Sequence, residues 1–217
     1  MEGPGQGRVI RKQNLPFRPD WERVISAVVD HILARPDVDA GRVALLGVSL
    51  GGHLAPRAAA FEKRLAACIA NGGVLDVCGP SVPRNMTREQ YASFIRNNPG
   101  EVDAGMRKMA EKASRRAGAR RMGNTPFMLP VRPNGSGSGS ITILTPVVKQ
   151  ITCPTLIIDV EHEDSFRGEA RKLYEALVCP KTWLFFTEEE GAGDHCQTGS
   201  PALAQQRIFD WLEETVP

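Results

Sequence analysis

The sequence lacks the features that mark several large classes of protein. Its formal net charge is only +2 over 217 residues, so no excess of basic residues predicts binding to nucleic acid or to an acidic membrane surface. No apolar run approaches the roughly 20 residues that cross a bilayer. The N-terminal segment Met1–Gly7 has no apolar region typical of a secretion signal. We therefore expect a cytoplasmic protein with no nucleic acid and no membrane as partner.

Cysteine is sparse, and its spacing is not that of a metal site. The five cysteines are odd in number and scattered along the chain, at Cys68, Cys78, Cys153, Cys179 and Cys196. This pattern indicates reduced thiols in a reducing compartment rather than a disulfide framework. The glycine-rich start of the chain is not followed by the Gly-Lys-Ser/Thr of a phosphate loop. We expect neither a metal nor a cofactor.

What is present is a regular alternation of apolar strands and amphipathic helices. Short apolar runs predict strands near residues 43–46, 67–70, 154–161 and 182–187. Helical spacing of apolar residues predicts helices near 21–34, 50–62, 168–178 and 202–215. This order predicts an α/β fold with an open, mostly parallel sheet and right-handed crossovers.

The chain divides into three expected segments. Residues 1–79 form the first part of a core, residues 80–146 a helical lid insertion, and residues 147–217 the second part of the core. Within the insertion, residues 113–140 contain crowded arginines and a Gly/Ser run that is typical of a flexible loop. We also hypothesise that this stretch is translated out of frame, which the coding DNA would decide.

The central motif is Gly47-Val48-Ser49-Leu50-Gly51. It follows a predicted strand and opens a predicted helix, which is the context of a nucleophile elbow. Glycine at positions 47 and 51 removes side chains that would collide with the neighbouring strand and helix. The pattern predicts Ser49 as a nucleophile and the backbone N–H of Leu50 as an oxyanion donor.

Two later loops follow strands and supply the other groups that a serine nucleophile needs. His195 is the best placed of four histidines to take the serine proton. In the loop at 162–166 we favour Asp164 over Glu163 as the acid that orients the imidazole, because we expect it to have the better reach. The order serine, acid, histidine is that of α/β-hydrolases. We interpret Asp194 and Cys196 as residues that shape the histidine loop.

The chain resembles α/β-hydrolases related to 2,6-dihydroxypseudooxynicotine hydrolase and to the fungal heptaketide-shortening hydrolase of melanin synthesis. The resemblance covers residues 1–112 and 147–217. It rests on four segments, at 2–7, 47–52, 154–166 and 190–197. It implies Ser49 as nucleophile, Asp164 as acid and His195 as base. It also implies cofactor-free hydrolysis of an ester, a thioester or a carbon–carbon bond beside a ketone, in a small-molecule carbonyl substrate.

Members of that family carry further strands before the segment that matches Glu2–Gly7, and one of those strands supplies the second oxyanion donor. We therefore expect an N-terminally incomplete sheet with a free edge, which would favour association into a homo-oligomer. Two other functions stay open beside the serine hydrolase. One is an inactive hydrolase fragment that serves association, and the other is an acyltransferase with the same three residues.

Overall fold

The computed structural model describes residues 1–15, 17–83, 85–98, 100–101 and 143–216. The chain forms two compact units. One contains residues 20–81 and the described residues from 143 onward, and the other contains the described residues of 1–19 and 82–101. Most of the expected lid, including residues 113–140, lies outside the described residues.

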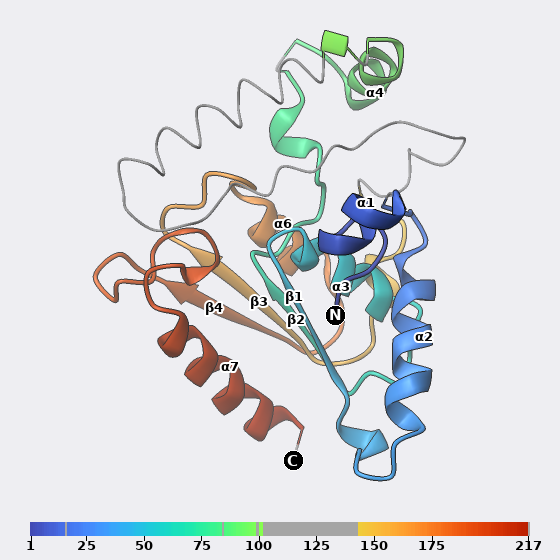
Figure 1. Ribbon diagram of the computed structural model, residues 1–217. Coiled ribbons are helices and arrows are strands. Elements are labelled where there is room, and N and C mark those ends of the chain that lie inside the picture. The colour runs from blue at the N-terminus through green and yellow to red at the C-terminus, as the bar shows by residue number, and fades with distance from the viewer. Residues whose placement is uncertain (16, 84, 99, 102–142, 217) are drawn as a thin grey trace. The chain divides into compact units, whose positions relative to one another are not determined.

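The larger unit is built on a parallel sheet. Its strands are β1 (Ala44–Val48), β2 (Ala67–Asn71), β3 (Thr155–Val160) and β4 (Lys181–Phe186), in the order β1-β2-β3-β4 (Figure 1). All three strand pairs are parallel, so the carboxyl ends of the strands meet at one edge. This is the α/β fold with an open parallel sheet that the alternation of elements predicted.

Helices cover both faces of this sheet. They are α2 (Trp21–Leu33), α3 (Gly51–Ala59), α6 (Glu169–Ala176) and α7 (Pro201–Thr215), with short 3₁₀ turns η1 (Ala40–Arg42), η2 (Gly79–Ser81), η3 (Val148–Gln150) and η4 (His195–Gln197). Helix α7 packs Ala204 and Ile208 against Ile158 and Phe186 of the sheet. Helix α3 contacts β1 and β2, and α6 contacts β3. Figure 1 shows α7 on one side of the sheet and α3 on the other.

The smaller unit contains α1 (Gly7–Gln13) and α4 (Arg88–Asn97). Helix α4 begins with a capping box, in which the Thr87 side chain accepts from the Gln90 N–H and the Gln90 side chain accepts from the Thr87 N–H. This start satisfies two backbone donors that a helix otherwise leaves unpaired. Helix α1 is not among the helices that the sequence predicted, because residues 2–7 are rich in glycine, which disfavours a helix. It ends at Asn14, whose φ of 53° is left-handed.

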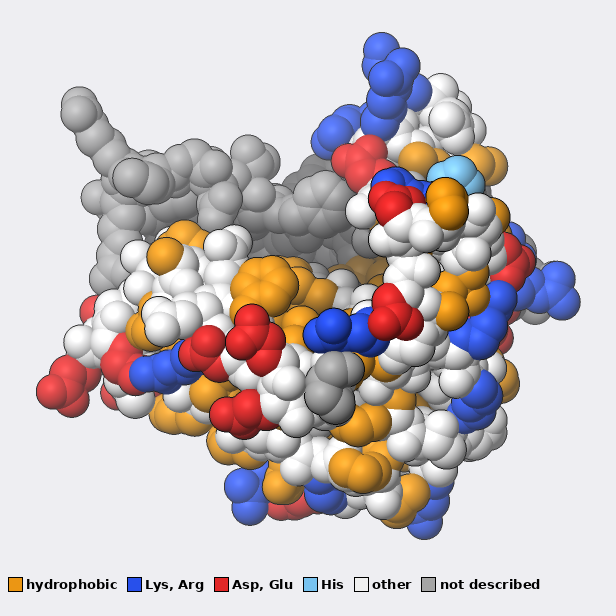
Figure 2. Space-filling view, turned by 90° about the horizontal axis from the view of Figure 1, so that it is seen from below, with side chains coloured by type: hydrophobic (Ala, Val, Ile, Leu, Met, Phe, Trp, Pro, Cys, Tyr) orange, Lys and Arg blue, Asp and Glu red, His pale blue; other side chains and the backbone are white. Residues whose placement is uncertain are grey.

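The surface mixes apolar and charged side chains. On the face shown in Figure 2, hydrophobic side chains lie in patches between basic and acidic ones. Strand β1 lies at an edge of the sheet and exposes Leu46 and Val48. Among the described residues, no helix is long and apolar enough to cross a membrane.

Candidate active site

Ser49 lies in a strained turn between β1 and α3. Its φ of 59° is left-handed, which is uncommon for a residue other than glycine. Two backbone hydrogen bonds hold the turn: Ser49 N–H donates to the Asn71 carbonyl at 2.9 Å, and Gly52 N–H donates to the Ser49 carbonyl at 2.7 Å. A Cβ atom on Gly47 would overlap the carbonyl of Gly51. Glycine at 47 is therefore required by the close approach of strand and helix. The same expectation for Gly51 is wrong, because a Cβ atom there would have no atom of the neighbouring strand or helix within 4 Å.

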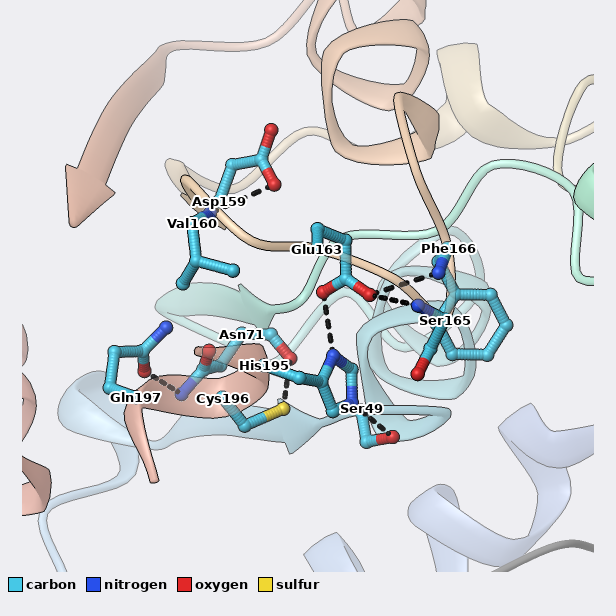
Figure 3. A network of polar contacts seen from close by, with 10 residues as sticks. All are labelled: Ser49, Asn71, Asp159, Val160, Glu163, Ser165, Phe166, His195, Cys196 and Gln197. Atoms are coloured by element: carbon cyan, nitrogen blue, oxygen red, sulfur yellow. Dashed lines mark hydrogen bonds and ion pairs between the residues drawn. The ribbon is translucent and has the colours of Figure 1, made fainter. Parts of the chain in front are cut away.

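His195 reaches this serine from the loop that follows β4. Its Nε2 lies 2.9 Å from Ser49 Oγ (Figure 3). The imidazole belongs to η4, where Cys196 and Gln197 have left-handed φ values of 55° and 53°. The structure thus brings together two side chains that are 146 positions apart in the sequence.

Glu163 holds the other side of the imidazole. Its Oε2 lies 2.6 Å from His195 Nδ1, while its Oε1 accepts from the N–H groups of Ser165 and Phe166 at 2.7 and 2.9 Å. The residue is only 6% exposed. Since a carboxylate can only accept here, the neutral form of the imidazole carries its proton on Nδ1 and presents the lone pair of Nε2 to Ser49. This is the tautomer that a general base requires.

The site shifts the pKa of both partners. Burial raises the pKa of Glu163, but the hydrogen bond and the charge of His195 and the two backbone N–H groups outweigh it, so that the pKa is lowered. For His195, burial opposes protonation, while contacts with the side chains of Cys196 and Glu163 outweigh it and raise the pKa to about 10. The pair therefore favours a charged imidazolium beside a carboxylate, which is the state that forms during proton transfer.

The expectation that Asp164 orients the imidazole is wrong, because the structure places Glu163 and not Asp164 against His195. The Asp164 side chain is 74% exposed and lies 2.9 Å from Arg167 at the surface. The turn after β3 directs consecutive side chains in different directions, so that residue 163 faces His195 and residue 164 faces solvent. Sequence spacing favoured neither residue, because the two positions differ by one in a loop. No local pattern in the sequence distinguishes Glu163, because its contacts with the N–H groups of Ser165 and Phe166 exist only in the folded turn.

Other histidine and acidic side chains of the chain make different contacts. His53 is buried, with Nδ1 3.2 Å from the Val74 carbonyl. His31 is exposed on α2. Asp159 accepts a hydrogen bond from Val160 N–H, and burial raises the pKa of its carboxyl. The backbones of Asp194 and His162 form an isolated parallel β-bridge, which joins the acid loop to the histidine loop.

Leu50 is the residue before the first turn of α3, with φ −55° and ψ −26°. Its N–H follows Ser49 directly, at the end of the helix where the macrodipole favours negative charge. The second oxyanion donor of an α/β-hydrolase comes from the exit loop of an earlier strand. In the part of the chain that the structure describes, β1 is the first strand and lies at the sheet edge.

One group of side chains beside the site has the composition of a metal site. Within the described ranges, His162, Glu188 and Asp194 offer ligand atoms that lie within 4.8 Å of one another. His162 and Glu188 are both largely exposed, and their side chains lie 3.5 Å apart. The contact of His162 with Glu188 is a surface ion pair, and such pairs form between exposed side chains without a metal ion.

Comparison with known proteins decides the family. The model of the alpha/beta hydrolase family matches residues 2–209. The chain belongs to the alpha/beta hydrolase family.

Curated relatives in this family are fungal hydrolases. Hydrolase ORFZ of Pyricularia oryzae is 30% identical over 99% of the chain and 54% of its own length. The 20-hydroxy-prefusarin hydrolase FUS2 of Gibberella moniliformis is 29% identical over 99% of the chain and 54% of its own length. The chain thus spans about half the length of the curated relatives it matches.

Solved structures share the fold. The 2,6-dihydroxy-pseudo-oxynicotine hydrolase superposes with a TM-score of 0.63 at 24% identity, over 99% of this chain and 51% of that one. MenH from S. aureus superposes with a TM-score of 0.62 at 16% identity, over 98% of this chain and 81% of that one. At these identities the likeness concerns the fold alone.

Proposed function

We propose that the chain is a serine hydrolase in which Ser49 is the nucleophile, His195 the general base and Glu163 the acid that orients the histidine. One observation carries the proposal. A hydroxyl, an imidazole and a buried carboxylate lie in line, with contacts of 2.9 Å and 2.6 Å. A serine hydroxyl is a poor nucleophile until such a base takes its proton.

In the proposed reaction, Ser49 Oγ attacks a carbonyl carbon while its proton passes to His195 Nε2. The resulting imidazolium donates from Nδ1 to Glu163, whose two backbone donors keep the carboxylate charged and in place. The N–H of Leu50 stabilises the oxyanion. His195 then gives the proton to the leaving group, whose bond to the acyl carbon breaks. In the second half, His195 takes a proton from a water molecule that attacks the acyl carbon, the bond to Ser49 Oγ breaks, and the proton returns to Ser49 as the acid leaves.

For the substrate we propose an acyl or β-dicarbonyl compound: an ester, a thioester or a carbon–carbon bond beside a ketone. The relative FUS2 is named for hydrolysis of 20-hydroxy-prefusarin, which favours a polyketide-like small molecule. We further propose a cytoplasmic location. All five cysteines are free, and burial raises the pKa of Cys68 and Cys153, which keeps these thiols protonated and unreactive.

The test uses a fluorophosphonate probe and a p-nitrophenyl ester on the full chain. We expect the probe to label Ser49, and we expect both labelling and ester hydrolysis to be lost in Ser49→Ala. An acyltransferase would require an added acceptor for turnover beyond the first acylation. A folded chain that the probe does not label would contradict the proposal and favour an association module.

A further inference from the structure

Two buried amides lie beside the His195 imidazole and outside the reaction proposed above. Asn71 is the last residue of β2 and Gln197 is the last residue of η4, and they are 5% and 0% exposed. Asn71 Nδ2 donates to Gln197 Oε1 at 2.8 Å, across 126 positions of sequence. In Figure 3 the pair lies on the side of the imidazole away from Phe166.

Asn71 contacts the other parts of the site as well. Its backbone carbonyl accepts the N–H of Ser49 at 2.9 Å and lies 3.9 Å from Cys196 Sγ. The register of the sheet pairs Asn71 with Val48, the residue before the nucleophile. One residue therefore fixes the backbone of the elbow with its carbonyl and the histidine loop with its side chain.

The histidine loop needs such a fixed point. Cys196 and Gln197 both have left-handed φ angles. Residues other than glycine keep this backbone conformation only when the surrounding structure holds them in it. Two side-chain contacts join this segment to the end of β2: the short amide–amide hydrogen bond of Gln197 with Asn71, at 2.8 Å, and the longer contact of Cys196 Sγ with the Asn71 carbonyl, at 3.9 Å. Without the amide–amide hydrogen bond, the loop could relax toward ordinary backbone angles and carry His195 away from Ser49.

The pair is a poor device for stability alone. Asn71 Oδ1 and Gln197 Nε2 are buried and have no hydrogen-bond partner among the described residues. Buried polar atoms left unpaired cost stability, and such exceptions concentrate at functional sites. Apolar residues of the same size would fill this space without that cost.

We propose that Asn71 and Gln197 are positioning residues, which hold the histidine loop against the nucleophile elbow so that His195 lies between Ser49 and Glu163. The inference rests on the proposed function for its effect on rate. Its geometric part, the placement of His195 against Glu163, is measurable without any activity.

The experiment compares three variants of the full chain. Gln197→Met keeps the volume and removes the acceptor, whereas Gln197→Glu keeps an acceptor for Asn71 Nδ2. Thr155→Val is the matched control. Thr155 is 0% exposed and accepts a buried hydrogen bond from Cys179. It lies at the amino end of β3, whereas Asn71 lies at the carboxyl end of β2, where the site is. Thermal melting measures the stability of each variant.

The first readout is the pKa of His195, followed by NMR of the imidazole and assigned with His195→Gln. We expect Gln197→Met to lower this pKa by about one unit or more, because the contact with Glu163 loosens. We expect Thr155→Val to leave the pKa at the value of the parent, and Gln197→Glu to leave it at that value or higher, because an added carboxylate favours the charged imidazole. The second readout is ester hydrolysis, in which Gln197→Met should lower kcat about 10- to 100-fold with little change in KM.

A purely structural pair would give a different result. Gln197→Met would then melt earlier, as Thr155→Val does, with the His195 pKa and kcat of the parent, and the inference would be overturned. If the parent is not labelled by a fluorophosphonate, the proposed function fails, but the pKa comparison still decides the positioning role. Should Gln197→Met not fold, Gln197→Asn replaces it, because it keeps the amide and shortens it by one methylene.

Discussion

The exchange of one carboxyl for an amide at position 163, compared with the same exchange at 164, tests the site most directly. In Glu163→Gln, one side-chain oxygen can still accept from the N–H groups of Ser165 and Phe166. The amide nitrogen then faces His195 Nδ1, where it can only donate. The imidazole must accept at Nδ1 and carry its proton on Nε2, so it can no longer take the proton of Ser49.

The magnitude follows from this change of tautomer. The equivalent exchange in a serine protease lowers kcat about 10⁴-fold. We expect a loss of about 10³- to 10⁴-fold here, or about 4–5 kcal/mol of transition-state stabilisation. The contact that is removed is short, at 2.6 Å, and the carboxyl is only 6% exposed, so water does not compensate for it.

Asp164→Asn is the control at the neighbouring position. Its side chain is 74% exposed and pairs with Arg167, which is itself 79% exposed. An ion pair of this kind contributes at most about 1 kcal/mol to stability. We expect kcat within about twofold of the parent, since uncharging a solvated group away from the reacting atoms leaves the transition state unchanged.

The assay is hydrolysis of a p-nitrophenyl ester, with thermal melting to show that both variants fold. Fluorophosphonate labelling of Ser49 gives an independent rate for the acylation step. A folded Glu163→Gln variant with the activity of the parent, together with an inactive Asp164→Asn variant, would refute the assignment of the acid and restore the expectation from the sequence.

Three further predictions follow from the same structure. The value of kcat/KM should rise with pH through an apparent pKa above 6.5, because His195 must be neutral to act as a base and its pKa is raised to about 10. A pH profile of kcat/KM measures this, and a rate that falls above neutral pH would contradict it. Gly47→Ala should destabilise the chain by about 3 kcal/mol or more, measured by urea unfolding, because its Cβ would overlap the Gly51 carbonyl. Glu62→Gln should lower stability by up to about 3 kcal/mol at pH 7. The Arg64 guanidinium lowers the Glu62 pKa from 4.5 to about 2, so this difference should disappear as the pH falls from 4.5 to 2.

Local pattern was sufficient for the elements of the larger unit. The apolar run at 154–161 became β3 (Thr155–Val160), and the helical spacing at 21–34 became α2 (Trp21–Leu33). These segments are strongly periodic, and each buries its apolar face against the same sheet. Helix α1 was missed because its start lies in a glycine-rich segment, where local propensity disfavours a helix.

The sequence by itself predicted the turn that presents Ser49 and the parallel sheet behind it. Glycine at position 47, a strand before Ser49 and a helix after it specify a sharp turn through local sterics, and the alternation of strands and helices specifies a parallel sheet.

Only the tertiary structure decided which acid faces His195 and what holds the histidine loop. Glu163 and Asp164 are adjacent and chemically alike, and the twist of one short turn buries the first and exposes the second. The contact of Asn71 with Gln197 joins residues 126 positions apart, so no local pattern encodes it. Such choices depend on packing and on hydrogen bonds between distant segments, which exist only after the strands have aligned their carboxyl ends.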